Sequence, residues 1–265
     1  KSPVFFIIEE DKTKAAVLKW TEAKLFLHLH FQTRGPIYYP VWAAKMAGKP
    51  ITNVDVLLFY PNLIGYARVI LTIASYCFAT TRWQLAVTLY AIGFVGDIFD
   101  GWVARKMNQQ SQFGAILDMV TDRAATAGLL AILASLYPDW TYAFVLLICL
   151  DLSSHWFQVN SAQREGRHHK QVAGRNLILR AYYEVYLFFG FCCVGTETFY
   201  MCLYILKFWP EAPFLFFPCS LAQANATLGL LCCSLKQFVN LCQLASACMT
   251  VASEDANRIN SSKGK

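Results

Sequence analysis

The sequence predicts an all-α protein that crosses a membrane several times. Of its 265 residues, 56% are hydrophobic and only 15% are charged, whereas about a quarter of a typical soluble domain is charged. The apolar residues form long runs without the alternation of a β-strand, which favours membrane helices over a membrane barrel. A mean hydropathy of +0.38 excludes a disordered chain and an ordinary soluble enzyme.

Six apolar segments have lengths that bracket the ~20 residues of a helical span. The first follows Pro61 and Asn62, which favour a helix start, and the last follows a proline-rich loop. The third and fourth segments are separated by Pro138 and Asp139. In chain order, the expected segments are about 63–80, 85–99, 115–137, 141–159, 183–208 and 221–252. The fold class is therefore a polytopic membrane protein with six transmembrane helices.

The basic residues predict how these helices are oriented. Arg105 and Lys106 follow the second segment, and most other basic residues of the membrane region fall between the fourth and fifth segments or in the tail. Because Lys and Arg gather on the cytosolic side, both chain ends are expected to face the cytosol. The formal charge of +6 is thus explained without a nucleic-acid partner. No internal repeat is visible, so an inverted-repeat transporter is not supported.

The first 45 residues differ from the rest of the chain. Their longest apolar stretch, 25–31, is too short to span a bilayer, and they lack the pattern of a signal peptide. Met46 opens the sequence that leads into the first predicted span. We therefore expect residues 1–45 to be an upstream extension and residues 46–265 to form the membrane domain.

Four aspartates lie at or near the ends of two neighbouring apolar segments. Asp97 and Asp100 are three residues apart, and Asp118 and Asp122 are four apart, so each pair shares one helix face. Because the connection between the segments is short, we expect the two helices to pack as antiparallel neighbours. The four carboxylates would then converge on one small volume.

Four carboxylates at membrane depth repel one another unless they are protonated or bind cations. Oxygen ligands select hard cations such as Mg²⁺ or Mn²⁺. Four carboxylates can hold two such ions about 3.5–4 Å apart, as in enzymes that transfer phosphoryl groups. The sequence therefore predicts a two-metal site at this point of the chain.

The residues between the two aspartate pairs suit a diphosphate ligand. Gly101 and Ala104 lack bulk, so that a ligand can approach the helix backbone. Arg105 can bind a phosphate through two parallel hydrogen bonds. Ser111 supplies a hydroxyl, although an ordinary polar loop residue is an equally good explanation of it. Gly114 permits close approach where the third helix begins.

These residues carry a resemblance to a known family. The pattern D-x-x-D-G-x-x-A-R, eight residues, then G-x-x-x-D-x-x-x-D is present without departure from Asp97 to Asp122. It resembles the signature of the CDP-alcohol phosphatidyltransferase family. The flanking stretches are similar to the eukaryotic branch that uses inositol as the acceptor. These stretches are FYPNLIGYARV (59–69), NQQSQFGAILDMVTDR (108–123), LDLSSHW (150–156) and the region 169–183.

The resemblance implies a six-helix fold and one reaction. An inositol hydroxyl would attack the β-phosphate of CDP-diacylglycerol, which gives phosphatidylinositol and CMP. It implies that Asp97, Asp100 and Asp118 ligate the metals, and that Asp122 also lies at the metal site and is the catalytic proton acceptor. The positions of Gly101, Arg105 and Ser111 would bind CDP-diacylglycerol. The family also suggests a homodimer, and the eukaryotic branch suggests the endoplasmic reticulum membrane.

Two alternatives remain open from the sequence. A sister enzyme would use glycerol 3-phosphate, serine or choline as the acceptor, because the shared motif does not separate the acceptors. A cation transporter would also place carboxylates inside a membrane, although the Gly and Arg residues between the aspartates argue against it.

The remaining polar residues have no settled role. Asn62 and Arg68 are explained equally well by contacts with a nucleotide or by a helix start and an interfacial side chain. His155 fits a packed core as well as a site, the role of Lys236 is open, and Arg180 is a candidate for contacts with inositol. The basic residues between the fourth and fifth segments are interpreted mainly as an anionic-lipid contact. They are Arg164, Arg167, His168, His169 and Lys170.

Overall fold

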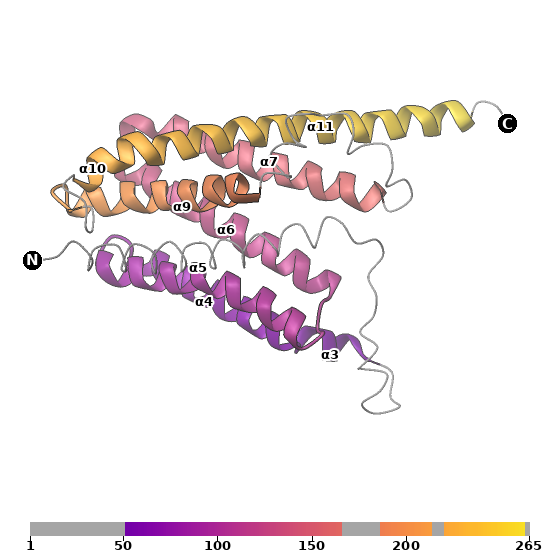
Figure 1. Cartoon of the computed structure of the whole chain (residues 1–265), viewed down its shortest axis with the longest axis horizontal. Helices are drawn as coiled ribbons and strands as arrows, with labels where there is room; N and C mark the ends of the chain where they lie inside the picture. Colours follow the sequence, from indigo (N-terminus) through magenta and orange to yellow (C-terminus); the bar gives the residue numbers. More distant parts are fainter. Residues whose placement is uncertain (1–50, 166–185, 214–219, 263–265) are drawn as a thin grey trace, which may run out of the picture.

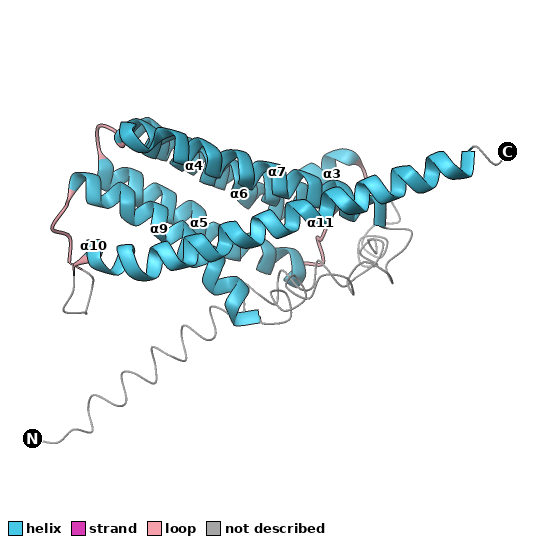
Figure 2. Cartoon of the chain, turned by 90° about the horizontal axis from the view of Figure 1, so that it is seen from above, coloured by secondary structure: helices cyan, strands magenta, loops and turns pink. Residues whose placement is uncertain are grey.

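The computed structural model describes residues 51–165, 186–213 and 220–262, and every regular element in these ranges is a helix (Figure 2). The predicted extension 1–45 and the sequence between the fourth and fifth segments from residue 166 to 185 lie outside the described residues. Arg180 and most of the proposed lipid-contacting cluster are therefore outside them as well.

Six long helical segments follow one another where the sequence predicts them. A short helix, α3, precedes them, and a 3-10 turn, η1, joins the third to the fourth. The last segment begins with α10 and one π-helical turn, η2. The elements are α3 Asn53–Leu57, α4 Tyr60–Phe78, α5 Trp83–Lys106, α6 Gln112–Leu136, η1 Pro138–Trp140, α7 Thr141–Glu165, α9 Tyr186–Phe208, α10 Leu221–Ala224, η2 Asn225–Gly229 and α11 Leu230–Ser262.

Four stretches of the described chain are long and apolar enough to cross a membrane. They are Trp83–Lys106, Pro138–Ser161, Phe191–Phe208 and Leu221–Ser262. An all-helical, multi-pass membrane protein is thereby confirmed. The helices α4 and α6 are not among these four, so the count of six spans stays a prediction.

The second helix is longer than expected. The sequence prediction ended it at Phe99, whereas α5 continues to Lys106 and contains the whole first half of the motif. It ends where Asn108 adopts a left-handed conformation with φ of 53°, which Asn tolerates better than most residues. As a result, Asp97, Asp100 and Arg105 are held at fixed helical spacings rather than on a loop.

The helix α4 lies against both α5 and α6, whereas α5 and α6 share few direct contacts with each other. The expected antiparallel packing of α5 on α6 is therefore wrong. Close approach of α4 is possible because it meets α6 through Gly65, where an added Cβ would lie 2.9 Å from Leu117. Small residues thus bring a third helix to the two that carry the aspartates.

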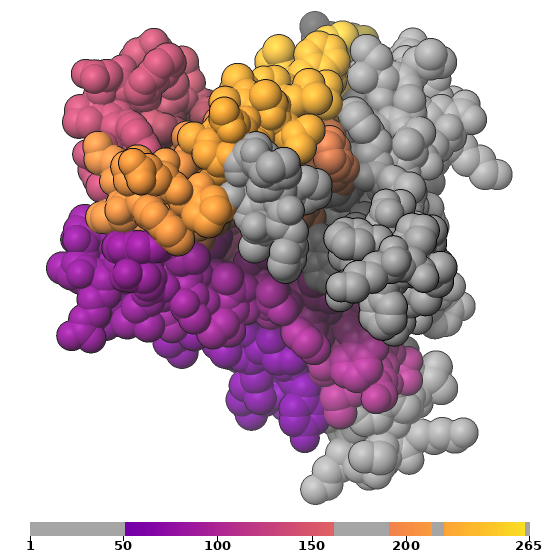
Figure 3. All heavy atoms as spheres, turned by 60° about the vertical axis from the view of Figure 1, so that its left-hand side comes forward, coloured from indigo at the N-terminus to yellow at the C-terminus, as the bar shows by residue number. Residues whose placement is uncertain are grey.

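The helices form two groups that α6 connects (Figure 1). One group is the pair α4 and α5, and the other contains α7, α9 and α11, in which α11 packs on both α7 and α9. In both views the last turns of α11 extend beyond the other helices (Figures 1 and 2). Figure 3 shows the pair α4 and α5 in indigo to purple below α9 and α11 in orange to yellow.

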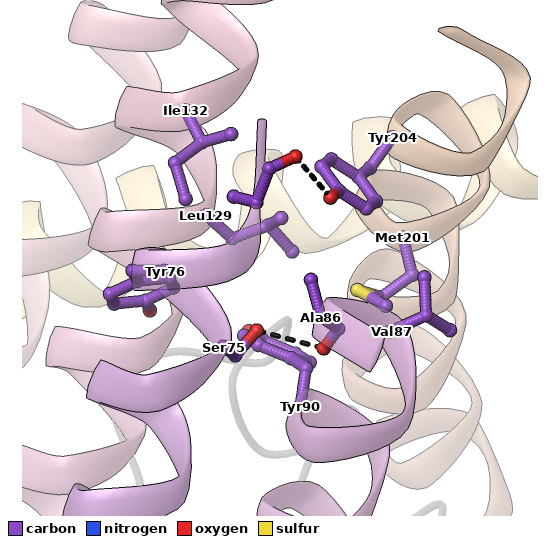
Figure 4. Close-up of a pocket in the computed structure, with 10 residues that line it drawn as sticks. Ser75, Tyr76, Ala86, Val87, Tyr90, Leu129, Ile132, Met201 and Tyr204 are labelled. Atoms are coloured by element: carbon purple, nitrogen blue, oxygen red, sulfur yellow. Dashed lines mark hydrogen bonds between the residues drawn. The ribbon is translucent and has the colours of Figure 1, made fainter. Parts of the chain in front are cut away.

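A small apolar cavity of about 10 Å³ lies where α4, α5, α6 and α9 meet, near the turn between α4 and α5 (Figure 4). Two hydrogen bonds tie its walls together: Ser75 Oγ donates to the Ala86 carbonyl at 2.8 Å, and Tyr204 Oη donates to the Ala79 carbonyl at 2.6 Å. The volume admits about one water molecule. This part of the bundle is therefore a packed core and offers no ligand site.

Candidate metal centre between three helices

The helix α5 presents its acidic residues from its second half. Asp97, Gly101 and Arg105 are spaced four residues apart and line one face, and Asp100 lies beside Asp97 one turn on. The side chains of both aspartates are only 10% exposed. Because an unpaired carboxylate is costly to bury, both need cationic partners.

The helix α6 presents the other pair from its first half. It begins at Ser111, whose hydroxyl oxygen accepts a hydrogen bond from the Gly114 backbone N–H at 3.0 Å and so caps the helix. An added Cβ on Gly114 would lie 2.8 Å from Asn62 Oδ1, so this glycine lets the start of α4 approach α6. From this start, Asp118 and Asp122 lie two and three turns into the helix.

The side chain of Arg68 enters the cluster from α4 and contacts all four aspartates. Its Nη1 donates to Asp100 at 2.5 Å and to Asp118 at 2.7 Å, and its Nη2 donates to Asp122 at 2.5 Å. The Nη2 atom also lies 3.2 Å from Asp97 Oδ1. The prediction that the four carboxylates converge is therefore confirmed, and they converge around a guanidinium group.

The donor set fits a divalent metal ion. Oxygen atoms of Asp97, Asp100 and Asp118 lie within 4.8 Å of one another, so that one cation could contact all three. The same three carboxylates contact the guanidinium of Arg68, so their oxygens face one cationic group in this structure. Asp122 is not part of this group of three, so its predicted role as a ligand rests on the resemblance alone.

The cluster is sealed on one side and open on the other. The side chains of Asp118 and Asp122 on α6 are 45% and 34% exposed, compared with 10% for each aspartate on α5. Ions and substrates can therefore reach the carboxylates more easily from the side of α6.

The residues predicted to bind a diphosphate lie near the same end of the two helices. Gly101 and Arg105 are in the last two turns of α5, and Ser111 is the cap of α6. Arg105 is half-buried and forms no ion pair with a carboxylate in the described part of the chain.

A second polar cluster lies directly behind Asp122. The next residue, Arg123, donates from Nη1 to both carboxylate oxygens of Asp151 on α7, at 2.9 and 3.0 Å. Asn240 on α11 donates to the same carboxylate at 3.3 Å. Arg123 Nη2 also lies 3.9 Å from Asp122 Oδ2. The cluster therefore ties three helices together beside Asp122.

Glu197 on α9 belongs to the same region. It accepts a hydrogen bond from Tyr90 of α5 and another from Thr126 of α6 at 3.1 Å. Together with Arg123 and Lys236, it lines a cavity of about 40 Å³. This volume corresponds to a few water molecules and is too small for a polyol ring, so the cavity in this conformation is not a site for the acceptor.

The structure gives contacts for three residues whose roles the sequence left open. Asn62 is buried and donates from Nδ2 to the Val56 carbonyl at 2.6 Å, which supports a role at the start of the helix. His155 Nδ1 lies 2.8 Å from the Asp151 carbonyl oxygen, as in a packed core. Lys236 is buried and faces the interior of the bundle instead of lipid.

The polar contacts of Arg123, Asp151, Glu197 and Asn240 were not predicted from the sequence. One signal was available, because ionisable residues inside apolar segments are rare and are paired when they occur. The spacing along one helix does not reveal which residue of another helix is the partner. These contacts join positions 28 to 107 residues apart in the chain.

The fold and the acidic site define a polytopic membrane protein with an acidic motif, shared between two helices, that could hold a metal ion. The family model described as CDP-alcohol phosphatidyltransferase matches residues 58–224. The chain belongs to the CDP-alcohol phosphatidyltransferase family.

Relatives that align over most of both chains are named CDP-diacylglycerol–inositol 3-phosphatidyltransferase. The relative from Schizosaccharomyces pombe is 36% identical over 225 residues, which cover 79% of this chain and 95% of the relative. The relative from Rattus norvegicus is 38% identical over 76% of this chain and 95% of its own length. The relative from Candida albicans is 37% identical over 77% of this chain and 86% of its own length. No solved structure matches the chain at a significant level.

Proposed function

We propose that the protein transfers the phosphatidyl group of CDP-diacylglycerol to myo-inositol and so forms phosphatidylinositol and CMP. The observation that carries this proposal is the convergence of the family's four aspartates within a bundle whose relatives are named for that reaction. The flanking stretches that resemble the inositol branch support this acceptor over glycerol 3-phosphate, serine or choline.

The carboxylates of Asp97, Asp100 and Asp118 hold Mg²⁺ or Mn²⁺ in this proposal, with Asp122 completing a two-metal site. When bound, the metals neutralise the diphosphate and the departing CMP. The donor set supports this assignment, because three carboxylate groups lie within reach of one ion and oxygen-only ligands favour these hard cations.

Asp122 accepts the proton of the attacking inositol hydroxyl. An alcohol is a poor nucleophile at neutral pH, and a carboxylate within hydrogen-bond reach can remove its proton as the bond to phosphorus forms. Asp122 is suited to this role because a third of its side chain is exposed, whereas the aspartates of α5 are sealed. Arg105, Gly101 and Ser111 bind the diphosphate and orient CDP-diacylglycerol.

The membrane setting follows from the same proposal. The catalytic unit is residues 46–265, it spans the endoplasmic reticulum membrane with six helices, and its active site lies near the cytosolic face. The position of Arg105 and Lys106 at the end of α5 supports this orientation, and Lys106 lies over the ring of Trp102 at 4.5 Å as in an interfacial anchor. A homodimer stays a prediction.

An acceptor panel tests the proposed function. The purified full chain is given CDP-diacylglycerol, Mg²⁺ or Mn²⁺, and one labelled alcohol at a time. We expect CMP release and labelled lipid with inositol only. Labelled lipid from serine or glycerol 3-phosphate but not from inositol would establish a sister enzyme, and metal uptake into proteoliposomes without CMP release would establish a transporter.

Two replacements of Ser111 separate its capping role from a role in substrate binding. Ser111→Ala removes the cap and is expected to destabilise the protein by about 1 kcal/mol. Ser111→Asn keeps a capping oxygen but loses the hydroxyl, so the melting temperature should stay near the wild-type value. If the hydroxyl binds CDP-diacylglycerol, the KM for this substrate rises in both variants. A normal KM in Ser111→Asn would show that Ser111 is only a cap.

A further inference from the structure

Arg68 is held in the acidic cluster by a complete set of acceptors. A guanidinium has five N–H bonds. Three of them are donated to Asp100, Asp118 and Asp122, and a fourth is donated from Nε to the backbone carbonyl of Gly93 at 3.2 Å. The remaining Nη2 donor faces Asp97 at 3.2 Å. The side chain of Arg68 is 4% exposed, so this position is fully enclosed.

The surrounding helices are shaped to receive this side chain. An added Cβ on Gly96 of α5 would lie 3.0 Å from Cγ and 3.4 Å from Cδ of Arg68, so the glycine leaves room for the arginine stem. The Gly93 carbonyl, one turn earlier on the same helix, accepts the Nε–H bond. The placement of Arg68 is therefore part of how α4 packs on α5. Gly96 leaves room for Cγ and Cδ of the side chain, and the Gly93 carbonyl holds its Nε.

The charges of the cluster explain why the carboxylates need a cation. They also explain why the Arg68 guanidinium competes with metal ions for the same oxygens. With all four carboxylates ionised, the single guanidinium that contacts them would leave three negative charges without a counter-charge. Without Arg68, all four carboxylates would repel one another at low effective dielectric. A divalent ion that binds the same oxygens meets a positive charge already hydrogen-bonded to them. Metal binding therefore has to break or rearrange some of these pairs.

We propose that Arg68 is a built-in counter-cation that holds the four carboxylates together in the metal-free protein and competes with the divalent ions for them. Arg68 lowers the metal affinity below what the carboxylates alone would give. In return, it keeps the four carboxylates together when no metal is bound. The inference goes beyond the proposed reaction, because it requires only that the cluster binds metal and not that the acceptor is inositol.

Titration of the purified full chain with Mn²⁺ in detergent micelles tests this role without measuring activity. Arg68→Met keeps the apolar stem of the side chain but removes the charge, and we expect it to lower the dissociation constant for Mn²⁺ by about tenfold or more. Arg68→Lys keeps the charge but loses the planar guanidinium that contacts four carboxylates. Its affinity for Mn²⁺ should therefore lie between those of the wild type and Arg68→Met. Arg82→Met, at the exposed start of α5, is the matched control and should bind Mn²⁺ like the wild type.

Thermal unfolding supplies the second measurement and covers the case in which Arg68→Met folds poorly. With EDTA, Arg68→Met should melt well below the wild type because its carboxylates lack a counter-ion. With saturating Mn²⁺, the difference should shrink, since tighter binding stabilises the folded state more. Weaker Mn²⁺ binding in both Arg68 variants, or an equal loss of melting temperature with and without Mn²⁺, would overturn the competitive role.

The outcomes also separate this inference from the proposed function. If the wild type binds no Mn²⁺ in the titration, the metal role of the cluster and the competition by Arg68 fail together. If the wild type binds Mn²⁺ and the variants do not bind it more tightly, only the inference about Arg68 fails. If the acceptor is not inositol, the Mn²⁺ titration and the thermal unfolding are unchanged, and the acceptor panel detects the difference.

Discussion

Asp122→Asn is expected to lower kcat for phosphatidyl transfer to inositol by about 10²–10⁴-fold, the usual contribution of a general base. The amide of Asn is nearly the same size as the carboxylate but does not accept the proton of the attacking hydroxyl. Because Asp97, Asp100 and Asp118 would still lie within reach of one ion, we expect binding of the first Mn²⁺ to change much less than kcat. The measurement is CMP release at saturating inositol, paired with a Mn²⁺ titration of the same preparation.

The control for this variant is Asp139→Asn, on the exposed turn between α6 and α7, which should have the activity of the wild type. Near-normal turnover in Asp122→Asn would show that another group accepts the proton. A loss of Mn²⁺ binding as large as the loss of kcat would instead assign Asp122 to the metal site alone.

Asp100→Asn is expected to abolish both metal binding and transfer, with activity reduced by at least about 10³-fold, since a catalytic metal supplies several kcal/mol of charge stabilisation. The side chain of Asp100 is 10% exposed and accepts a hydrogen bond from Arg68 Nη1 at 2.5 Å. The replacement removes one negative charge from the most enclosed part of the cluster and leaves a single ligand oxygen there. The measurement is CMP release over a range of Mn²⁺ concentrations.

A rise in the required Mn²⁺ concentration with recovery at high metal would identify Asp100 as one ligand among several. Activity that matches the wild type at every Mn²⁺ concentration would remove Asp100 from the site. The melting temperature in EDTA is the check on folding. It should not fall sharply, because Asp100→Asn also removes one source of repulsion from the cluster.

The convergence of the aspartates could be predicted in part, because helical spacing and a short connection are visible in the sequence, although the pairs meet against α4 and not through direct packing of α5 on α6. Asp97 with Asp100 and Asp118 with Asp122 each occupy one helix face. The positions of the long helices were also predictable, because apolar runs of this length have few other stable structures in a membrane. The extension of α5 to Lys106 was not predicted. The sequence becomes less apolar after Phe99, and this change was interpreted as the end of the helix.

The partner of the aspartates could not be predicted from the sequence. Arg68 is 50 residues from Asp118 in the chain and meets it only because α4 lies against both α5 and α6. Spacing along one helix predicts which residues share a face. It does not predict which other helix packs against that face. For the same reason, the contact of Arg123 with Asp151 and Asn240 appeared only in the structure. Ser111 shows another limit, because the cap of α6 and a substrate ligand require the same type of residue.

The position of Arg68 on α4 has a consequence for biosynthesis in the membrane. Each charged side chain that enters a bilayer within a helix costs about 2.5–3.5 kcal/mol on insertion scales. The five charged groups of the cluster come from three consecutive helices, within residues 68–122. A nascent chain therefore has a partner for its aspartates as soon as α6 has been made, before α7 emerges from the ribosome. We expect these three helices to leave the translocon together as one unit, instead of entering the lipid one at a time.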